Sequence, residues 1–302
     1  MKDFISLLDY SHDELVHVLD RADVLCDVWQ QNQLPQRLAD KQIGLWFYGN
    51  GFRNRMAFEI GARAMGGQVS YIPGELGKHE PLEDIGGYLE NWYAMLVVRA
   101  ANHSDLTYLA NDVAIPVINA RTNLGHPCEI MGDLQFIRKH RGTLDGLHLA
   151  FVGEATNLYM SWLEASVRFP IRVTQIAPEP YLASAAMLNA YNAQALGRAD
   201  TSSDFDSVLD DHIDVIYTDC WPKADEHTAK EEIRELFLPY QVTGNHLSGL
   251  KAGAMFLPCP PVTRGEEVSE AAMRSPLCLN HQTKAHLLHS QNAIMEMLAT
   301  RI

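Results

Sequence analysis

The chain has 302 residues, of which 47% are apolar and 21% charged, and it carries 38 acidic against 24 basic side chains, a formal charge of −14. This is the composition of a globular protein with enough apolar surface for a sizeable core, and the length favours about two domains. So acidic a chain is not expected to bind nucleic acid or an anionic membrane non-specifically, although a local basic pocket can still hold a small anion.

The cysteines indicate whether disulfides or a structural metal are expected, and the N-terminal segment indicates where in the cell the protein is located. The five cysteines are widely scattered and no pair has zinc-site spacing, which argues against a disulfide framework and a structural metal. The first twenty residues lack the basic-then-apolar pattern of a signal peptide, and no apolar run is long enough to cross a bilayer. We therefore expect a cytoplasmic protein.

The first part of the chain alternates helical and strand-like patterns. Apolar residues at helical spacing occupy residues 12–40, and Ser11 is a plausible N-cap for a helix there. Strands are expected at residues 43–47, 69–72, 95–98 and 115–118, and helices at residues 53–65, 81–93 and 127–140. This alternation predicts a parallel sheet with helices on its faces.

A second series of strands begins after Arg141-Gly142. Its members are residues 147–152, 171–176, 213–217 and 254–257, and residues 286–302 are helical by pattern. We therefore predict an α/β fold of two doubly wound parallel-sheet domains joined by a helix, with the C-terminal helix returning to the first domain. The predicted domains are residues 1–135 together with 286–302, and residues 136–285.

The first candidate site is the loop that follows the first predicted strand. Ligands of open parallel sheets lie beyond the carboxyl ends of the strands. The loop reads Gly49-Asn50-Gly51-Phe52-Arg53-Asn54-Arg55 and leads into a helix. Glycines expose backbone amides, a helix N-terminus favours anions and arginines match phosphate oxygens. The loop therefore indicates a phosphate site with Arg53 as a ligand, whereas Arg55 is expected to pair with Glu59 one turn further on.

Two further residues lie where loops follow strands. Arg99 follows the apolar run 95–98, so it is expected beside the first loop. His126 precedes Pro127, and proline favours the first turn of a helix. The positive end of a helix dipole favours a neutral imidazole, which can donate a hydrogen bond to a carbonyl oxygen. The alternative for His126 is a structural histidine at a helix start.

In their order and spacing these segments resemble the aspartate/ornithine carbamoyltransferase family over nearly the whole chain. The resemblance implies a first domain that binds carbamoyl phosphate, a second that binds an amino acid, and a homotrimer with active sites between subunits. The matching segments are residues 47–59, 66–67, 77–84, 99, 126–129, 133–134, 151–157, 219–221, 258–261 and 275–276.

The reaction that the resemblance implies is attack of an amine on the carbamoyl carbon, with phosphate leaving. It needs no metal, cofactor or covalent enzyme intermediate, only positioning and charge stabilisation. By matching position, Arg53 and Arg99 bind carbamoyl phosphate and His126 donates to its carbonyl oxygen. Asn157 and Asp219 orient the amino acid, although a turn residue and a strand-end cap are the simpler interpretations. Further predicted substrate-binding residues are Gly51, Phe52, Asn54, Arg55, Glu129, Lys223, Cys259 and Pro260.

A charged loop in the first half has a separate implied role. By the resemblance, Lys78 and His79 reach the active site of the neighbouring subunit. A solvated charged loop is the alternative. Lys223 is in turn a candidate to contact an acidic acceptor, with solvent exposure as its alternative.

The departures from the family pattern fall on the predicted site. The family's Ser-Thr-Arg-Thr-Arg loop reads Gly51-Phe52-Arg53-Asn54-Arg55, and the glutamine of its His-Pro-x-Gln motif is Glu129. Its His-Cys-Leu-Pro loop is Pro258-Cys259-Pro260-Pro261, and the Ser-Met-Gly of the ornithine enzymes is Lys223-Ala224-Asp225. The arginine expected near the start of the last helix is Leu287, with Arg264 and Lys284 as candidates to replace it.

The sequence therefore predicts a carbamoyltransferase that moves the carbamoyl group of carbamoyl phosphate to an amino acid or related amine. The alternative is a homologue without standard catalysis that binds a small anion or has a structural or regulatory role, because each lost oxyanion donor costs on the order of 100- to 1000-fold in turnover. A nicotinamide-dependent enzyme is set aside, because residues 151–156 hold only one glycine of the G-x-G-x-x-G turn.

Overall fold

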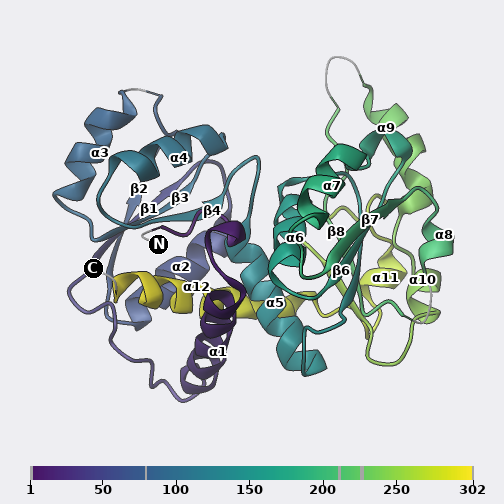
Figure 1. Ribbon diagram of the computed structural model, residues 1–302, viewed down its shortest axis with the longest axis horizontal. Helices are drawn as coiled ribbons and strands as arrows, with labels where there is room; N and C mark the ends of the chain where they lie inside the picture. The colour runs from purple at the N-terminus through teal and green to yellow at the C-terminus, as the bar shows by residue number, and fades with distance from the viewer. Residues whose placement is uncertain (1–2, 79, 210–211, 225–227, 301–302) are drawn as a thin grey trace. The chain divides into compact units, whose positions relative to one another are not determined.

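The computed structural model describes residues 3–78, 80–209, 212–224 and 228–300 (Figure 1). Contacts within the chain divide it into two compact units. The first unit consists of Met1–His140 and Lys284–Ile302, and the second of Arg141–Thr283.

The first unit is built on a parallel sheet with the strand order β2-β1-β3-β4. Every residue of β1 after Gln42 is buried, which is typical of a strand covered on both faces. Helices α3 and α4 cover one face of the sheet, and α2 and α12 lie on the other (Figure 1). The elements are η1 (Leu7–Asp9), α1 (His12–Trp29), β1 (Gln42–Phe47), α2 (Phe52–Ala64), β2 (Gln68–Ile72), α3 (Leu82–Glu90), β3 (Met95–Arg99), α4 (His103–Asp112), β4 (Val117–Arg121), α5 (Pro127–Arg141) and α12 (Asn280–Ala299).

Helix α1 is shorter than the apolar pattern of residues 12–40. It starts where predicted, because the Ser11 hydroxyl accepts a hydrogen bond from the Glu14 amide and the Glu14 carboxylate accepts one from the Ser11 amide. It ends at Trp29, and Asn32 and Asp40 adopt left-handed backbone angles (φ of 54° and 62°) that a helix excludes. The helical spacing of apolar residues therefore extends beyond the end of α1 into the turns that follow it.

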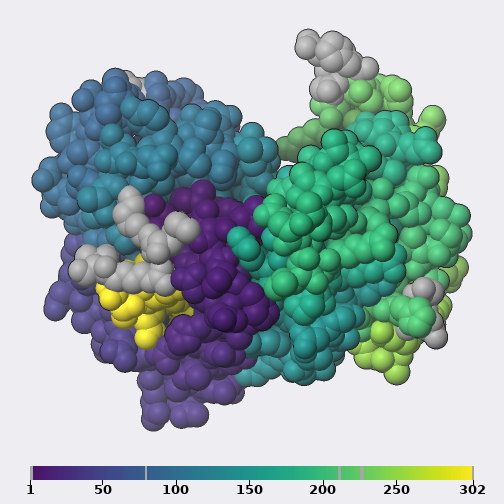
Figure 2. All heavy atoms as spheres, viewed as in Figure 1, coloured from purple at the N-terminus to yellow at the C-terminus, as the bar shows by residue number. Residues whose placement is uncertain are grey.

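Helix α12 packs against helices of the first unit. The Arg21 guanidinium of α1 bonds to the Glu296 carboxylate of α12 at 3.0 Å, and the two helices lie side by side at the surface (Figure 2). Gly61 of α2 faces Asn292, because an added Cβ there would lie 2.0 Å from the Asn292 Oδ1 atom. The predicted return of the C-terminal helix to the first domain is confirmed.

The second unit is built on a parallel sheet with the strand order β7-β6-β5-β8-β9. Four of these strands match predicted runs; β7, which reads Arg-Ala-Asp-Thr-Ser, does not, because only Ala199 in it is buried. The elements are β5 (His148–Val152), α6 (Asn157–Arg168), β6 (Arg172–Ile176), η2 (Glu179–Tyr181), α7 (Ala185–Asn192), β7 (Arg198–Ser202), α8 (Phe205–Val208), β8 (Val215–Thr218), α9 (Lys230–Phe237), η3 (Leu238–Tyr240), α10 (Gly244–Ser248), β9 (Met255–Pro258) and α11 (Glu270–Met273).

Both sheets reverse their winding direction beside their first strand. The reversal lies between β1 and β3 in the first unit and between β5 and β8 in the second. Loops after such a pair of strands diverge and leave room for a ligand. The predicted α/β class with two doubly wound parallel sheets is confirmed. In each sheet the ligand site is expected at the carboxyl ends of the two strands beside the reversal.

Candidate functional site

The glycine-rich loop after β1 is joined to the end of β3. The Tyr48 amide donates to the Arg99 carbonyl at 2.8 Å. Gly49 and Gly51 have φ angles of 69° and 30°, a region that favours glycine. Gly51 is the N-cap of α2 and has no side chain to bond the first amides of the helix. The predicted anion loop and Arg99 therefore lie together at the winding reversal.

The Arg99 side chain lies across Gly51. A Cβ atom added at Gly51 would be 2.8 Å from Arg99 Cδ and 2.9 Å from Arg99 Nε. A side chain at this position would displace Arg99, so the loss of the motif's serine makes room for the guanidinium arm. Glycine here is required by both the backbone angle and the contact.

A third arginine lies at the same edge and was not predicted. The expected strand 115–118 is in fact Val117–Arg121, so Arg121 is the last residue of β4. Arg121 pairs in register with Arg99, and its carbonyl accepts from the Ala100 amide at 3.0 Å. Extending the strand to its carboxyl end would have found Arg121.

Phe52 supports Arg53 and does not fill the site. Its side chain is 50% exposed, and the Arg53 guanidinium carbon lies 4.7 Å from the centre of its ring. At this distance the ring face attracts the cation. The bulky replacement for a family hydroxyl therefore holds an arginine at the start of α2.

The predicted pairing of Arg55 with Glu59 is wrong. Glu59 pairs with Arg63 at 3.2 Å, one turn further along α2. The Arg55 guanidinium carbon lies instead 4.9 Å from the centre of the Tyr71 ring. The Arg55 side chain therefore packs against Tyr71 of β2.

Asn54 is an internal link. It is buried, and its amide nitrogen donates to the Ala120 carbonyl at 3.2 Å and lies 3.5 Å from His126 Nε2. Its oxygen accepts from Gln291 Nε2 at 3.0 Å. Asn54 therefore connects α2 to β4, to His126 and to α12.

His126 lies buried at the start of α5. Burial lowers the pKa of its imidazole to about 3, and the charges of Arg99, Arg121 and Lys284 act in the same direction, whereas Glu129 opposes them. The ring is therefore neutral at pH 7 and carries one N–H donor. Sequence reasoning expected this neutrality from the helix dipole, and in the structure burial is the largest cause.

Glu129 is buried and ion-paired. Its Oε1 atom lies 2.6 Å from Lys284 Nζ, and its Oε2 atom lies 3.6 Å from His126 Nε2. Burial acts to raise its pKa, but the charge and the hydrogen bond of Lys284, together with the charge of Arg53, outweigh burial, so the pKa is lowered and the group is ionised. The carboxylate that replaces the family's glutamine thus has its own cation.

The structure distinguishes the two candidates for the missing arginine. Lys284 belongs to the first unit and also bonds both oxygens of Asp133, at 2.8 and 3.1 Å. Arg264 belongs to the second unit and pairs with Glu270 at 2.8 Å. Leu287 is buried in the first unit. Lys284 is therefore the cation at Glu129.

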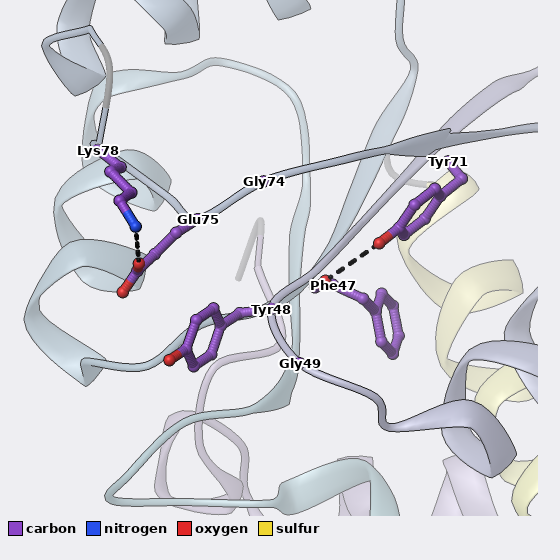
Figure 3. Close-up of a pocket in the computed structure, with 7 residues that line it drawn as sticks. All are labelled: Phe47, Tyr48, Gly49, Tyr71, Gly74, Glu75 and Lys78. Atoms are coloured by element: carbon purple, nitrogen blue, oxygen red, sulfur yellow. Dashed lines mark hydrogen bonds and ion pairs between the residues drawn. The ribbon is translucent and has the colours of Figure 1, made fainter.

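An open cavity of about 310 Å³ adjoins the anion loop (Figure 3). Lys78 on its rim is 60% exposed and pairs with Glu75 at 3.5 Å, while the Tyr71 hydroxyl donates to the Phe47 carbonyl at 3.5 Å. His79, predicted beside Lys78, lies outside the described residues. The lining residues are Phe47, Tyr48, Gly49, Tyr71, Gly74, Glu75 and Lys78.

In the second unit the predicted acceptor residues lie at the winding reversal. The Thr218 hydroxyl donates to the Val152 carbonyl at 2.8 Å and so joins the ends of β8 and β5. Asn157 is buried as the first residue of α6, after β5. Asp219 follows β8 and accepts from the Cys220 amide at 2.8 Å. Asp219 is therefore also the strand-end cap that the simpler interpretation named.

Glu154 is an acidic neighbour that sequence reasoning did not single out. Burial raises the pKa of Glu154, and the charge of Asp219 raises it further. Glu154 and Asp219 follow strands β5 and β8, which pair in parallel, so both lie at the same edge of the sheet. The signal was present in the sequence, because Glu154 belongs to the loop that follows the predicted strand 147–152.

A pocket of about 290 Å³ lies next to these residues in the second unit. Lys223 lines it and is exposed, and Asp225 lies outside the described residues. Buried Glu267 accepts from the amides of Trp221 and Thr263, at 2.9 and 2.6 Å. The pocket is lined by Cys220, Trp221, Pro222, Lys223, Ala224, Lys230, Ile233, Arg234, Thr263, Glu266 and Glu267.

The predicted Cys259 and Pro260 follow the neighbouring strand β9. Cys259 is buried, and its amide donates to the Thr218 carbonyl at 2.8 Å. This bond continues the pairing of β8 with β9 past the end of the strand and places Pro260 after it. Both residues therefore lie at the same edge of the sheet as Asp219.

The described residues contain neither a candidate metal site nor a membrane-spanning helix. Within residues 3–78, 80–209, 212–224 and 228–300, no group of three or more His, Cys, Asp or Glu side chains could hold a metal ion. Over the same residues, no helix combines the length and the apolar character needed to cross a membrane.

Both halves of the chain match domains of one known protein family. Residues 2–139 match the carbamoyl-phosphate-binding domain of aspartate/ornithine carbamoyltransferases, and residues 145–298 match their aspartate/ornithine-binding domain. The chain belongs to the aspartate/ornithine carbamoyltransferase family. The resemblance inferred from the sequence is confirmed.

Individual carbamoyltransferases are similar along their whole length. An ornithine carbamoyltransferase of Symbiobacterium thermophilum is 31% identical, over 98% of this chain and 97% of the relative. The anabolic ornithine carbamoyltransferase of Pseudomonas aeruginosa is 30% identical, over 99% of this chain and 97% of the relative. The solved ornithine carbamoyltransferase of Pyrococcus furiosus superposes with a TM-score of 0.91 at 27% identity, covering 100% of this chain and 98% of that one.

Proposed function

We propose that this protein transfers the carbamoyl group of carbamoyl phosphate to the amino group of an amino acid. One observation carries the proposal: Arg99 lies across Gly51 at the start of α2, next to Arg53 and on the same sheet edge as Arg121. A helix N-terminus lined by guanidinium groups is suited to a compact dianion such as a phosphate ester. Although the family's motif hydroxyls are missing, the arginines and the N-terminus of α2 still favour phosphate at this site.

The first unit would supply the electrostatic part of the reaction. Arg53, Arg99 and the amides at the start of α2 bind the phosphate and stabilise it as it leaves. His126 is neutral, so it can donate a hydrogen bond to the carbonyl oxygen as negative charge develops there. Glu129 accepts from the carbamoyl NH₂. No group is required to form a covalent bond with the substrate.

The second unit would hold the acceptor. Asp219 and Glu154 attract the ammonium form of an amine, which must lose a proton to solvent before its lone pair attacks the carbamoyl carbon. Asn157 orients the rest of the amino acid. Lys223 and Arg234 line the adjoining pocket and suit a carboxylate of the acceptor. The named relatives make ornithine the first acceptor to test, and acidic amino acids the second.

We also propose that the protein is a cytoplasmic homotrimer. Phe52, Met56 and Ile60 are 50%, 38% and 43% exposed, and they follow one another at intervals of four residues on α2. Side chains at this spacing form one apolar stripe along a helix, and exposed stripes are typical of interfaces. In such a trimer Lys78 and His79 would reach the site of a neighbouring subunit.

Calorimetry with inorganic phosphate and carbamoyl phosphate tests the proposed anion site. We expect Arg53→Ala to weaken binding about 100-fold, because a bidentate guanidinium contributes two charge-assisted hydrogen bonds. Arg63→Ala is the matched control, since Arg63 lies on the same helix and pairs with Glu59. Equal binding by Arg53→Ala and the wild type would contradict the proposed site.

A phosphate-release screen tests the transfer itself. Carbamoyl phosphate is mixed with single amino acids, beginning with ornithine, and release above the spontaneous rate identifies the acceptor. If the protein binds phosphate but no amino acid accelerates release, it is an anion-binding homologue and the proposed transfer is wrong.

A further inference from the structure

A buried ion network joins helices α5 and α12 behind the anion loop. The Lys284 ammonium contacts Glu129 Oε1 at 2.6 Å, Asp133 Oδ1 at 2.8 Å and Asp133 Oδ2 at 3.1 Å. The side chains of Lys284, Glu129 and Asp133 are 11%, 8% and 0% exposed. Ions this deeply buried remain charged only when they are paired, so the network depends on all three members.

Close packing of the two helices fixes the position of Lys284. An added Cβ at Gly132 would lie 3.2 Å from Leu287 Cδ2 and 3.3 Å from Leu287 Cα, so α12 approaches α5 closely there. Lys284 lies one turn before Leu287, while Glu129 and Asp133 lie on either side of Gly132 along α5. Leu287 stands where the family has an arginine. Its close contact with Gly132 brings Lys284, one turn earlier on α12, to the carboxylates of Glu129 and Asp133.

The network continues to the catalytic side of the unit. Glu129 Oε2 lies 3.6 Å from His126 Nε2, which lies 3.5 Å from the Asn54 amide nitrogen. Asn54 accepts from Gln291, two turns further along α12 than Lys284. Helix α12 therefore holds both ends of a buried polar chain that passes His126.

The charges around Glu129 set its ionisation. Lys284 of α12 and Arg53 of α2 are the cations that face it, the neutral His126 just before α5 lies beside it, and Asp133 faces Lys284. Of these, Lys284 makes the shortest contact with the carboxylate, at 2.6 Å. Without Lys284, two buried carboxylates would remain, and burial would favour the protonated form of Glu129.

We propose that Lys284 is a positioning residue that holds Glu129 as a carboxylate, and that Glu129 thereby selects a ligand with an N–H group on its carbonyl carbon. The inference rests on the proposed binding of carbamoyl phosphate and names what the site discriminates. An ionised carboxylate only accepts hydrogen bonds, so it binds an amide N–H and leaves a methyl group of the same size without a partner. A protonated Glu129 would offer an O–H donor beside its remaining acceptor oxygen, and this weakens the distinction.

Two phosphonates of equal size test this selection. Phosphonoacetamide carries an NH₂ group on its carbonyl carbon, and acetonylphosphonate carries a methyl group instead. Both share the phosphonate, so its own protonation largely cancels in the ratio of their dissociation constants. We expect the wild type to prefer phosphonoacetamide about tenfold or more by calorimetry, with the same ratio from pH 6 to pH 9.

Variants at Lys284 separate positioning from folding. In Lys284→Met the preference should fall below about threefold at pH 6 and return towards pH 9 as Glu129 ionises. Lys284→Arg should keep a flat preference, because it keeps the charge. If Lys284→Met does not fold, Glu129→Gln combined with Lys284→Met removes one buried carboxylate and should show a preference without pH dependence. Lys139→Met is the matched control, since Lys139 pairs with Asp27 at the surface of the same unit.

The outcomes distinguish the inference from the function on which it rests. Equal affinity of the wild type for both phosphonates, with inorganic phosphate still bound, overturns the selection and leaves the anion site intact. A flat, full preference in Lys284→Met overturns the role of Lys284. If neither phosphonate nor inorganic phosphate binds, the proposed function fails and this inference fails with it.

Discussion

At the scale of single residues, the departures from the family motif compensate for one another. Gly51 in place of serine makes room for Arg99, whose side chain lies 2.8 Å from the position of a Cβ there. Phe52 in place of threonine offers a ring face to Arg53. Glu129 in place of glutamine is neutralised by Lys284. Each substitution that removes a neutral donor is accompanied by a contact with a cation.

Glu129 also sets how tightly the site binds an anion. Replacing it with glutamine removes one negative charge near Arg53 and His126, while Lys284 keeps its bonds to Asp133. At the effective dielectric of a partly buried site, such a charge contributes about 1 kcal/mol, so Glu129→Gln should bind inorganic phosphate about fivefold more tightly. Calorimetry measures the affinity, and Glu59→Gln on the outer side of α2 is the control. Weaker binding by Glu129→Gln would show that its charge favours the bound anion.

At the scale of secondary structure elements, the approach of α12 to α5 carries the site. Gly132→Ala should lower the free energy of unfolding by about 1–2 kcal/mol, because its Cβ would press on the backbone of Leu287 at 3.3 Å. Gly87→Ala in α3 is the matched control, since nothing lies within 4 Å of the added atom and alanine favours helix more than glycine. Urea denaturation measures both variants. Equal stability changes in the two would contradict the close packing of α12 on α5.

The sequence predicted eight of the strands because each is a short apolar run. Strand β7 escaped prediction, since it is an edge strand with one buried residue. The last helix was predicted from residue 286, but it begins at Asn280, and the omitted turn contains Lys284. A hydrophobic pattern does not register a lysine that is buried by ion pairing. The loops of the site were thus predictable, whereas the pairing of Lys284 with Glu129 depends on how two distant helices pack.

At the scale of the whole molecule, a chain of formal charge −14 concentrates cations at one edge of a sheet. Arg53, Arg99 and Arg121 lie there, and the buried carboxylate of Glu129 has Lys284 as its partner. The surrounding acidic surface disfavours large polyanions, and the local field favours a small one. The overall charge and the proposed substrate are therefore compatible.

The apolar stripe of α2 provides the test of assembly. If Phe52, Met56 and Ile60 form a contact between copies, the wild type should sediment at about three times the chain mass of 33.8 kDa. Met56→Glu places a charge in the middle of that contact, and burying an unpaired charge is costly, so this variant should sediment as a monomer. Val24→Glu is the control, because Val24 is an exposed apolar residue on α1. A wild type that remains monomeric at all concentrations, or a Met56→Glu variant that assembles like the wild type, would contradict the proposed interface. Loss of phosphate release in the dissociated variant, with phosphate binding retained, would further support a contribution of the Lys78 loop to a neighbouring site.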